Sequence, residues 1–221
     1  MAKDKMKAAS KVHTQYKLAD GTKIPGTTTV LSVLAKPALV HWAWDLGVKQ
    51  IDYRKYVDKL ATVGTIAHYL VECHCKGEKP ALDAYSKEEI SLAENAFISF
   101  LEWEKDKEIK YLHNEIVLVS EAYRYGGTID CVAEINGVPT LLDFKTGKAI
   151  YPEMLVQLAA YRHLLKENGY SVDEVRILRI GRDESEGFEE RKETDLWTHW
   201  EMFKCLRQVY ELNKAINRKA G

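Results

Sequence analysis

One stretch of sequence predicts the centre of the fold: Gly-Thr-Ile-Asp-Cys-Val-Ala-Glu-Ile-Asn-Gly-Val-Pro-Thr-Leu-Leu-Asp-Phe-Lys, residues 127–145. The Asn-Gly pair at 136–137 is a strong hairpin signal, because both central positions of the favoured two-residue turn need positive φ. That turn places Asp130 directly across from Asp143, with Lys145 on the same face as Asp143. Like charges directly opposite each other destabilise a sheet. The two carboxylates therefore indicate a cation between them.

An alternative is a solvated hairpin that carries scattered acids, since Asp-x-Lys alone is a weak pattern. Leu141, Leu142 and Phe144 surround Asp143. A strand this apolar is typical of a buried sheet rather than of an exposed hairpin. The hairpin is therefore expected to lie in the core.

Composition favours a globular protein. The chain has 221 residues, of which 46% are hydrophobic, and we expect a single domain over residues 1–221, although the length allows two. The net charge of -1 gives no sign of a broad nucleic-acid footprint, but it leaves room for a local positive groove. Without an apolar run of membrane-spanning length or a signal-peptide core, we expect a soluble cytoplasmic protein.

The four cysteines are few and irregularly spaced, which indicates neither a disulfide framework nor a standard zinc site. Cys73-His74-Cys75 could bind a metal. A helix, however, turns adjacent positions to different faces, and the second half of a zinc site is missing. Ordinary helix cysteines are the favoured interpretation.

The order of elements predicts the fold class. We expect residues 1–12 to be disordered, a small hairpin at 16–23, and a helical lead-in over 24–62 in which threonine hydroxyls at 27–29 cap a short helix that stops near Pro37. The remaining expected elements are helices at about 38–60, 61–76, 86–107, 152–166 and 196–218, and strands at 115–119, 127–135, 138–145 and 175–180. This order predicts an α/β fold with a mixed central sheet flanked by helices and a core over residues 64–181.

Two of these helices carry further polar candidates. His68 and Glu72 lie four residues apart and share one helix face, although a lone histidine there is usually structural. Gln157 shares a face with Met154 and Tyr161. A buried amide needs partners, so Gln157 is expected either to bind a ligand or to brace the backbone.

Together these motifs resemble the RecB-type branch of the PD-(D/E)xK nuclease superfamily. The ordered elements are Gly-x-x-x-His-x-x-x-Glu, a Glu-bearing strand, Gly-x-Ile-Asp, Asp-x-Lys-Thr-Gly and Gln-x-x-x-Tyr. In this chain they are Gly64, His68 and Glu72; Glu115; Gly127, Ile129 and Asp130; Asp143, Lys145, Thr146 and Gly147; and Gln157 and Tyr161. The resemblance spans about residues 64–161. It implies a restriction-endonuclease-like core with an N-terminal helical extension.

The upstream stretches 24–31 and 37–43 are similar to the lead-in of phage-encoded and mitochondrial genome-maintenance exonucleases. This similarity is looser than that of the core, and Gly26 stands where a serine is expected.

The resemblance also implies roles. Asp130 and Asp143, helped by His68 and the backbone carbonyl of Phe144, would ligate Mg²⁺ or Mn²⁺, which prefer oxygen ligands. Lys145 would orient the attacking water or stabilise the scissile phosphate.

Other residues would assist this group. Gln157 and Tyr161 would belong to the catalytic group, lining the DNA side of the site and steadying Lys145 or the phosphates. Thr146 would also contact the DNA. Glu72 and Glu115 are second-line candidates for bracing His68 or holding a second ion. Trp42 and Trp44 precede the core and could roof the cleft as stacking surfaces, although they fit packed helix faces as well.

The chain departs from many relatives of this branch in one respect. Their iron–sulfur cluster needs three cysteines after the core, whereas here only Cys205 follows Lys145, so no cluster is expected. A Gly-x-x-x-x-Gly-Lys-Ser/Thr motif is also missing, which indicates a stand-alone nuclease or one that works with a helicase or single-strand annealing partner.

Three functions remain open at this point. The first is a DNA exonuclease in recombination, repair or end-processing, the second is a structure-specific endonuclease on the same fold, and the third is a non-catalytic DNA-binding module. The complete set of His, Asp, Asp, Lys and Gln argues against the third. A module without chemistry has no need of opposed carboxylates.

Overall fold

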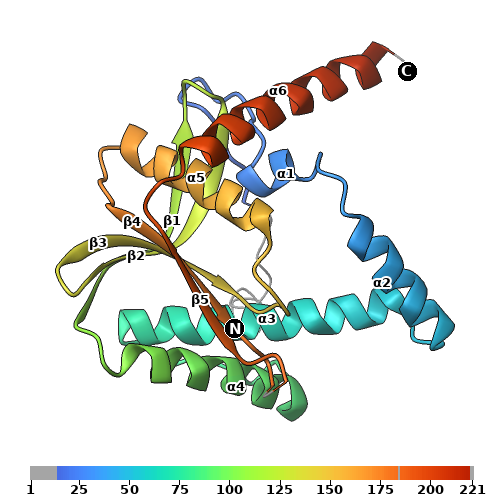
Figure 1. Ribbon diagram of the computed structural model, residues 1–221, viewed down its shortest axis with the longest axis vertical. Helices are drawn as coiled ribbons and strands as arrows, with labels where there is room; N and C mark the ends of the chain where they lie inside the picture. The colour runs from blue at the N-terminus through green and yellow to red at the C-terminus, as the bar shows by residue number, and fades with distance from the viewer. Residues whose placement is uncertain (1–13, 184, 220–221) are drawn as a thin grey trace, which may run out of the picture.

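The computed structural model describes residues 14–183 and 185–219 (Figure 1). The expectation of disorder over residues 1–12 falls outside this part of the chain. The elements are α1 (Thr27–Leu31), α2 (Pro37–Val48), α3 (Tyr53–Lys76), α4 (Lys87–Glu104), β1 (Ile109–Ser120), β2 (Tyr125–Ile135), β3 (Val138–Lys145), α5 (Pro152–Glu167), β4 (Glu174–Ile180), β5 (Phe188–Glu193) and α6 (Trp197–Lys219).

A five-stranded mixed sheet forms the centre, in the order β1-β2-β3-β4-β5. Only β3 and β4 pair in parallel, and α5 makes the crossover between them. The predicted α/β class, with a mixed sheet flanked by helices, is confirmed.

The hairpin between β2 and β3 has the predicted turn and register. Asn136 and Gly137 have φ of 49° and 81°, as a turn with two positive φ values requires. Pairs run from Ile135↔Val138 to Cys131↔Leu142. The next positions along this register are Asp130 and Asp143.

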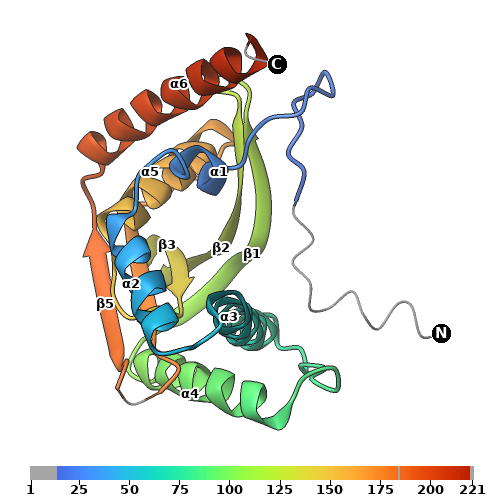
Figure 2. The ribbon, with the colours of Figure 1, turned by 90° about the vertical axis from the view of Figure 1, so that its right-hand side faces the viewer.

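Helices cover both faces of the sheet (Figure 2). On one face α1, α5 and α6 close a core that includes Ile129, Leu141 and Leu158. On the other face α3 and α4 close a second core around Phe100 and Phe144. The polar residues predicted from the sequence motifs lie where α3, α5 and the first three strands meet.

The predicted boundary between helices at residues 60 and 61 is wrong, because α3 runs unbroken through it. The chain turns earlier, and Asp52 caps α3 by accepting hydrogen bonds from the backbone N–H groups of Arg54 and Lys55 at 2.9 and 3.2 Å. An aspartate three residues before Lys55 was the signal for this helix start.

The expectation that threonine hydroxyls cap α1 is also wrong. Gly26 is the N-cap residue, and a backbone bridge to Gly126 fixes it in place. Thr27 lies inside the helix, and its hydroxyl donates to the carbonyl oxygen of Gly126 at 2.9 Å. The small hairpin predicted at 16–23 is present as a bridge between Lys17 and Lys23.

Strand β5 was not predicted from the sequence. Phe188–Glu193 is polar and mostly exposed, so no hydrophobic alternation marks it. Cross-strand ion pairs hold it to β4, among them Arg179 with Glu189 at 3.0 Å and Arg176 with Glu190 at 2.9 Å. Charged side chains on an edge strand also discourage pairing with another chain.

Among residues 14–183 and 185–219, no helix combines the length and the apolar character needed to span a bilayer.

Candidate metal centre

Three potential metal ligands converge from three elements. His68 on α3, Glu115 on β1 and Asp130 on β2 each offer one ligand atom, and these atoms lie within 4.8 Å of one another. Nδ1 of His68 is 3.7 Å from Oδ2 of Asp130. Within the described ranges this is the one group of three or more such side chains. Two carboxylates and one imidazole suit a hard divalent cation, with a tolerance for manganese.

Glu115 occupies this position through an unusual backbone conformation. Its φ is 51°, a left-handed value that is rare for a residue other than glycine within a strand. The neighbouring pairs Asn114↔Cys131 and Ile116↔Ile129 place it opposite Asp130. Such a conformation costs about 1–3 kcal/mol and persists only where the surrounding structure enforces it. The sequence supplied no sign of this, and Glu115 was only a second-line candidate.

The β2–β3 ladder stops one pair before Asp130 and Asp143. At that point the backbone N–H of Phe144 donates to Oδ2 of Asp130 at 3.0 Å. The carboxylate of Asp130 thus accepts this hydrogen bond in place of a backbone carbonyl of the neighbouring strand. This contact fixes the carboxylate of Asp130 against the end of β3.

Asp143 belongs to a second group beside the first. It is fully buried, and its Oδ2 lies 2.5 Å from Nζ of Lys145. Gln157 on α5 donates from Nε2 to Oδ1 of Asp143 at 3.4 Å and to the hydroxyl of Tyr161 at 2.9 Å. Burial, and after it the nearby charges of Asp143 and Asp130, raise the pKa of Tyr161 well above its usual value. The phenol therefore stays neutral and accepts the amide hydrogen of Gln157.

Two glycines of the sequence motifs permit this packing. A Cβ at Gly127 would lie 2.6 Å from Cε1 of Tyr161, and a Cβ at Gly64 would lie 2.7 Å from Oγ1 of Thr146. Atoms this close must shift apart. Gly127 thus lets α5 rest on β2, and Gly64 lets α3 approach the loop after β3.

The remaining candidates lie elsewhere. The carboxylate of Glu72 forms an ion pair with Lys76, four residues further along α3. In the Cys73-His74-Cys75 stretch, His74 contacts the carboxylate of Glu104 at 2.7 Å. These contacts agree with the interpretation of this stretch as an ordinary part of a helix.

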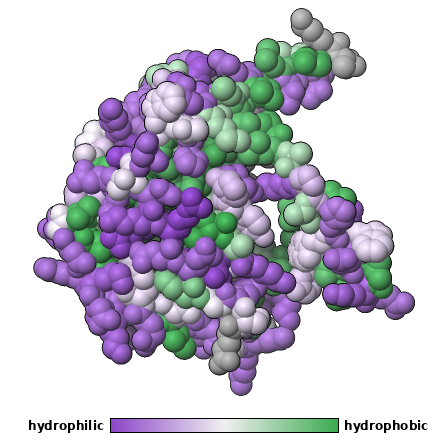
Figure 3. Space-filling view, viewed as in Figure 1, coloured by the Kyte–Doolittle hydropathy of each residue, from purple (hydrophilic) through white to green (hydrophobic). Residues whose placement is uncertain are grey.

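The two tryptophans of α2 differ in exposure. Trp42 packs edge-on against Tyr53 and Tyr56, with ring centroids 5.5 and 6.0 Å apart. Trp44 is 67% exposed. In Figure 3 the surface is open between α2 and the rest of the molecule. Trp44 is therefore the tryptophan of the pair that is available for stacking.

Sequence reasoning missed Tyr16. Its hydroxyl lies 3.0 Å from Oγ1 of Thr128, and a Cβ at Gly126 would lie 2.4 Å from its ring. The ring therefore covers β2 next to the motif that carries Asp130. Two consecutive glycines in a strand were the available signal, because they indicate the close approach of another segment.

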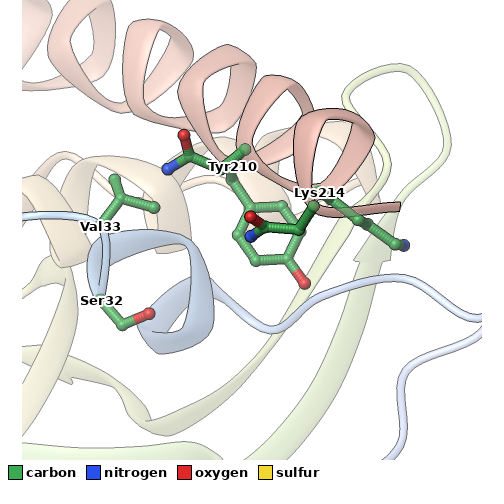
Figure 4. Close-up of a pocket in the computed structure, with 6 residues that line it drawn as sticks. Ser32, Val33, Tyr210 and Lys214 are labelled. Atoms are coloured by element: carbon green, nitrogen blue, oxygen red, sulfur yellow. The ribbon is translucent and has the colours of Figure 1, made fainter. Parts of the chain in front are cut away.

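A hollow of about 460 Å³ lies apart from this centre, between α1 and α6 (Figure 4). Its lining residues are Ser32, Val33, Tyr210, Asn213, Lys214 and Asn217. None of them is a carboxylate or an imidazole, so the hollow lacks the ligands of a metal site.

No protein-family model matches the chain, and no curated protein matches its sequence. The solved structures that are similar to this chain include the following three. The crystal structure of LHK-Exo in complex with dAMP has 11% identity and a TM-score of 0.39, over 70% of this chain and 83% of the other. A candidate exonuclease from Eubacterium rectale has 11% identity and a TM-score of 0.43, over 69% and 65%.

The third structure, SSO0001, has 15% identity and a TM-score of 0.34, over 71% and 74% of the two chains. Exonuclease structures are thus among the solved structures similar to this chain. Likenesses this distant carry no argument about the activity of this chain, which has to be argued from its own topology and side chains.

Proposed function

We propose that the chain is a divalent-metal-dependent DNA exonuclease with a PD-(D/E)xK core. The observation that carries this proposal is the convergence of His68, Glu115 and Asp130 within 4.8 Å, next to the Asp143–Lys145 pair at 2.5 Å. Phosphodiester hydrolysis needs a set of metal ligands beside a cationic group, and here that group is the partly buried Lys145.

His68, Glu115 and Asp130 would hold Mg²⁺ or Mn²⁺, and Asp143 would complete the set from the adjacent strand. The bound ion supplies Lewis acidity for the attack of water on phosphorus and neutralises charge that builds up on the phosphate oxygens. No iron–sulfur cluster is part of the proposal.

The protein groups divide the remaining tasks. Lys145 lies at the end of β3, where its ammonium can donate to a phosphate oxygen or to the attacking water. Gln157 holds Asp143 and Tyr161 in fixed positions by its two hydrogen bonds. The attacking water forms the new P–O bond, the bond to the leaving nucleoside oxygen breaks, and a proton passes to that oxygen or to solvent.

Substrate choice is the finer part of the proposal. Helix α2 stands away from the sheet, and Lys36, the residue before it, forms an ion pair with Glu153 of α5 at 3.2 Å. The opening beside it in Figure 3 and the exposed ring of Trp44 suit a single strand that stacks its bases on the way to the metal centre. We therefore propose linear DNA with a single-stranded portion as the substrate, degraded from an end.

The order of motifs over residues 64–161 supports the RecB-type branch and a role in recombination, repair or end-processing. A helicase or single-strand annealing protein fits as a partner, because the chain carries no nucleotide-binding motif of its own.

The test compares linear single-stranded, tailed duplex and covalently closed circular DNA, each with Mg²⁺, with Mn²⁺ and with EDTA. We expect degradation of the linear forms in either metal, and intact circles. Asp130→Asn, purified in parallel, reports any contaminating nuclease. Rapid nicking of closed circles would replace the exonuclease with an endonuclease, full activity in EDTA would refute the metal requirement, and tight DNA binding without cleavage would favour a binding module.

A further inference from the structure

The C-terminal half of α6 projects beyond the rest of the molecule (Figure 1), and its large apolar residues are exposed. Val209 is 42% exposed, Leu212 62% and Ile216 63%. Earlier on the helix, Met202 is 42% exposed and Cys205 is also exposed. Figure 3 shows hydrophobic surface gathered along this projecting end.

The face of the same helix half that turns toward α1 is polar. Tyr210, Asn213, Lys214 and Asn217 line the hollow next to α1 (Figure 4). In the first half of α6 the arrangement is the ordinary one, since Phe203 is buried against the molecule's own core. Where it projects, the helix therefore turns a polar face toward the hollow and leaves an apolar face exposed. Nothing among the described residues of the chain covers that apolar face.

The spacing of the apolar row identifies what fits it. Intervals of three, four, three and four separate its members, which are Met202, Cys205, Val209, Leu212 and Ile216. This is the repeat of a coiled-coil seam, which buries its residues against a second helix. Val209 and Ile216 fall at the first position of the repeat and Leu212 at the second. β-branched residues at the first and leucine at the second favour two parallel strands.

The absence of charged residues beside the apolar row favours one kind of partner helix. Along the projecting half, the positions that flank the row are Gln208, Asn213 and Ala215, none of which is charged. A partner helix chosen by charge would find nothing complementary there. An identical surface, in contrast, meets no like-charge repulsion. We propose that this row, Met202 to Ile216, is the seam of a parallel homodimer, in which α6 of a second copy of the chain packs in register against α6 of the first.

The test is the mass of the full chain in solution over a wide concentration series, by sedimentation velocity. We expect a monomer–dimer equilibrium, because two heptads give a short seam. The double variant Leu212→Lys/Ile216→Lys should raise the dimer dissociation constant by more than about tenfold, since it places four charges in the seam. Asn217→Lys, an exposed position off the row, is the matched control and should leave the equilibrium unchanged.

Cys205 reports the orientation of the two helices. In a parallel, in-register pair it faces Cys205 of the second copy, so oxidation with diamide should link the dimer through this residue, and Cys205→Ser should keep the dimer but lose the link. Dimers without this cross-link would refute the parallel register. Dimers that survive the double lysine variant would assign the contact to another surface. A wild-type monomer at every concentration would overturn the proposal, as expected if the row binds a different protein or another segment of the chain.

Discussion

The two ends of the β2–β3 hairpin are built differently. At the turn end, the strands pair in register from Ile135↔Val138 onward and the turn residues adopt the φ values that an Asn-Gly turn needs. At the open end, the ladder stops before Asp130, and Glu115 on the neighbouring strand takes a φ of 51°. The same sheet thus combines a regular half with a strained half.

This difference indicates which end of the hairpin is the less stable one. The turn end satisfies backbone groups by strand pairing and follows local preference. The open end places carboxylates side by side and bends the backbone to bring them together, which lowers stability and is retained where a site requires it. Substitutions of one chemical kind should therefore have different effects at the two ends.

The largest effect is expected from Asp130→Asn. The change removes one charge of the proposed ligand set, so cleavage should fall by roughly 10²–10³-fold, while the melting temperature stays the same or rises because repulsion is relieved. Glu134→Gln, on the exposed turn end of the same strand, should change neither. Release of soluble nucleotides and thermal unfolding measure the two quantities, and equal losses from both substitutions would remove the distinction between the ends.

Asp143→Asn sharpens this comparison. It should lower cleavage to a similar extent, but it breaks the buried contact with Lys145 and should lower the free energy of unfolding by up to ~3 kcal/mol. Denaturant titration of both asparagine variants measures this. If Asp143→Asn proves as stable as Asp130→Asn, the contact between Asp143 and Lys145 contributes no stability.

Next in size is Lys145→Ala. We expect DNA and metal binding near the wild-type level with slower cleavage, because the ammonium acts mainly in the transition state. Lys110→Ala, exposed at the turn end, is the control. A cleavage rate within about threefold of wild type, under ~1 kcal/mol of barrier, would contradict the role given to Lys145.

Two glycine substitutions come next. Gly127→Ala drives a methyl group toward the ring of Tyr161 at 2.6 Å and should cost about 1–3 kcal/mol of stability, together with activity, because Gln157 and Asp143 are linked to that ring. Gly137→Ala, at φ of 81° in the turn, should cost about 1 kcal/mol and leave the activity of folded molecules unchanged. Unfolding curves and specific activity of the folded fraction decide between these outcomes.

The smallest expected effect is on stability, where glycine substitutions at the two ends should change the melting temperature differently. Glu134→Gly weakens a regular strand by about 0.5–1 kcal/mol, whereas Glu115→Gly relieves a left-handed glutamate and should melt at a higher temperature than Glu134→Gly. Only Glu115→Gly should lower cleavage. If Glu115→Gly melts at the lower temperature, the strain at residue 115 is not what separates the two ends.

Local signals allowed the regular part of the molecule to be predicted from its sequence. The Asn-Gly turn fixed the hairpin register, and Pro152 at the start of α5 marked a helix that the structure confirms. Strand β5 could not be predicted, because ion pairs to β4 rather than apolar side chains hold it.

The site was predictable in composition but not in arrangement. His68 and Asp130 were expected together, and they meet at 3.7 Å. Glu115 joins them through a backbone conformation for which a glutamate gives no signal, and Asp143 lies on the adjacent strand in contact with Lys145. Both outcomes depend on the packing of segments distant in sequence, which short-range patterns do not encode.

The order in which the site is assembled follows from where its parts lie along the chain. Asp143, Lys145 and Gln157 come from β3 and α5. Glu115 and Asp130 come from the preceding strands β1 and β2, so short loop closures bring all of them together. His68 arrives from α3, across the whole of α4, and needs a much longer closure. A chain caught partway through folding therefore holds acids and a lysine without the imidazole. On the proposed function, the docking of α3 completes the catalytic centre. Newly made chains would therefore cleave DNA only once they are fully folded.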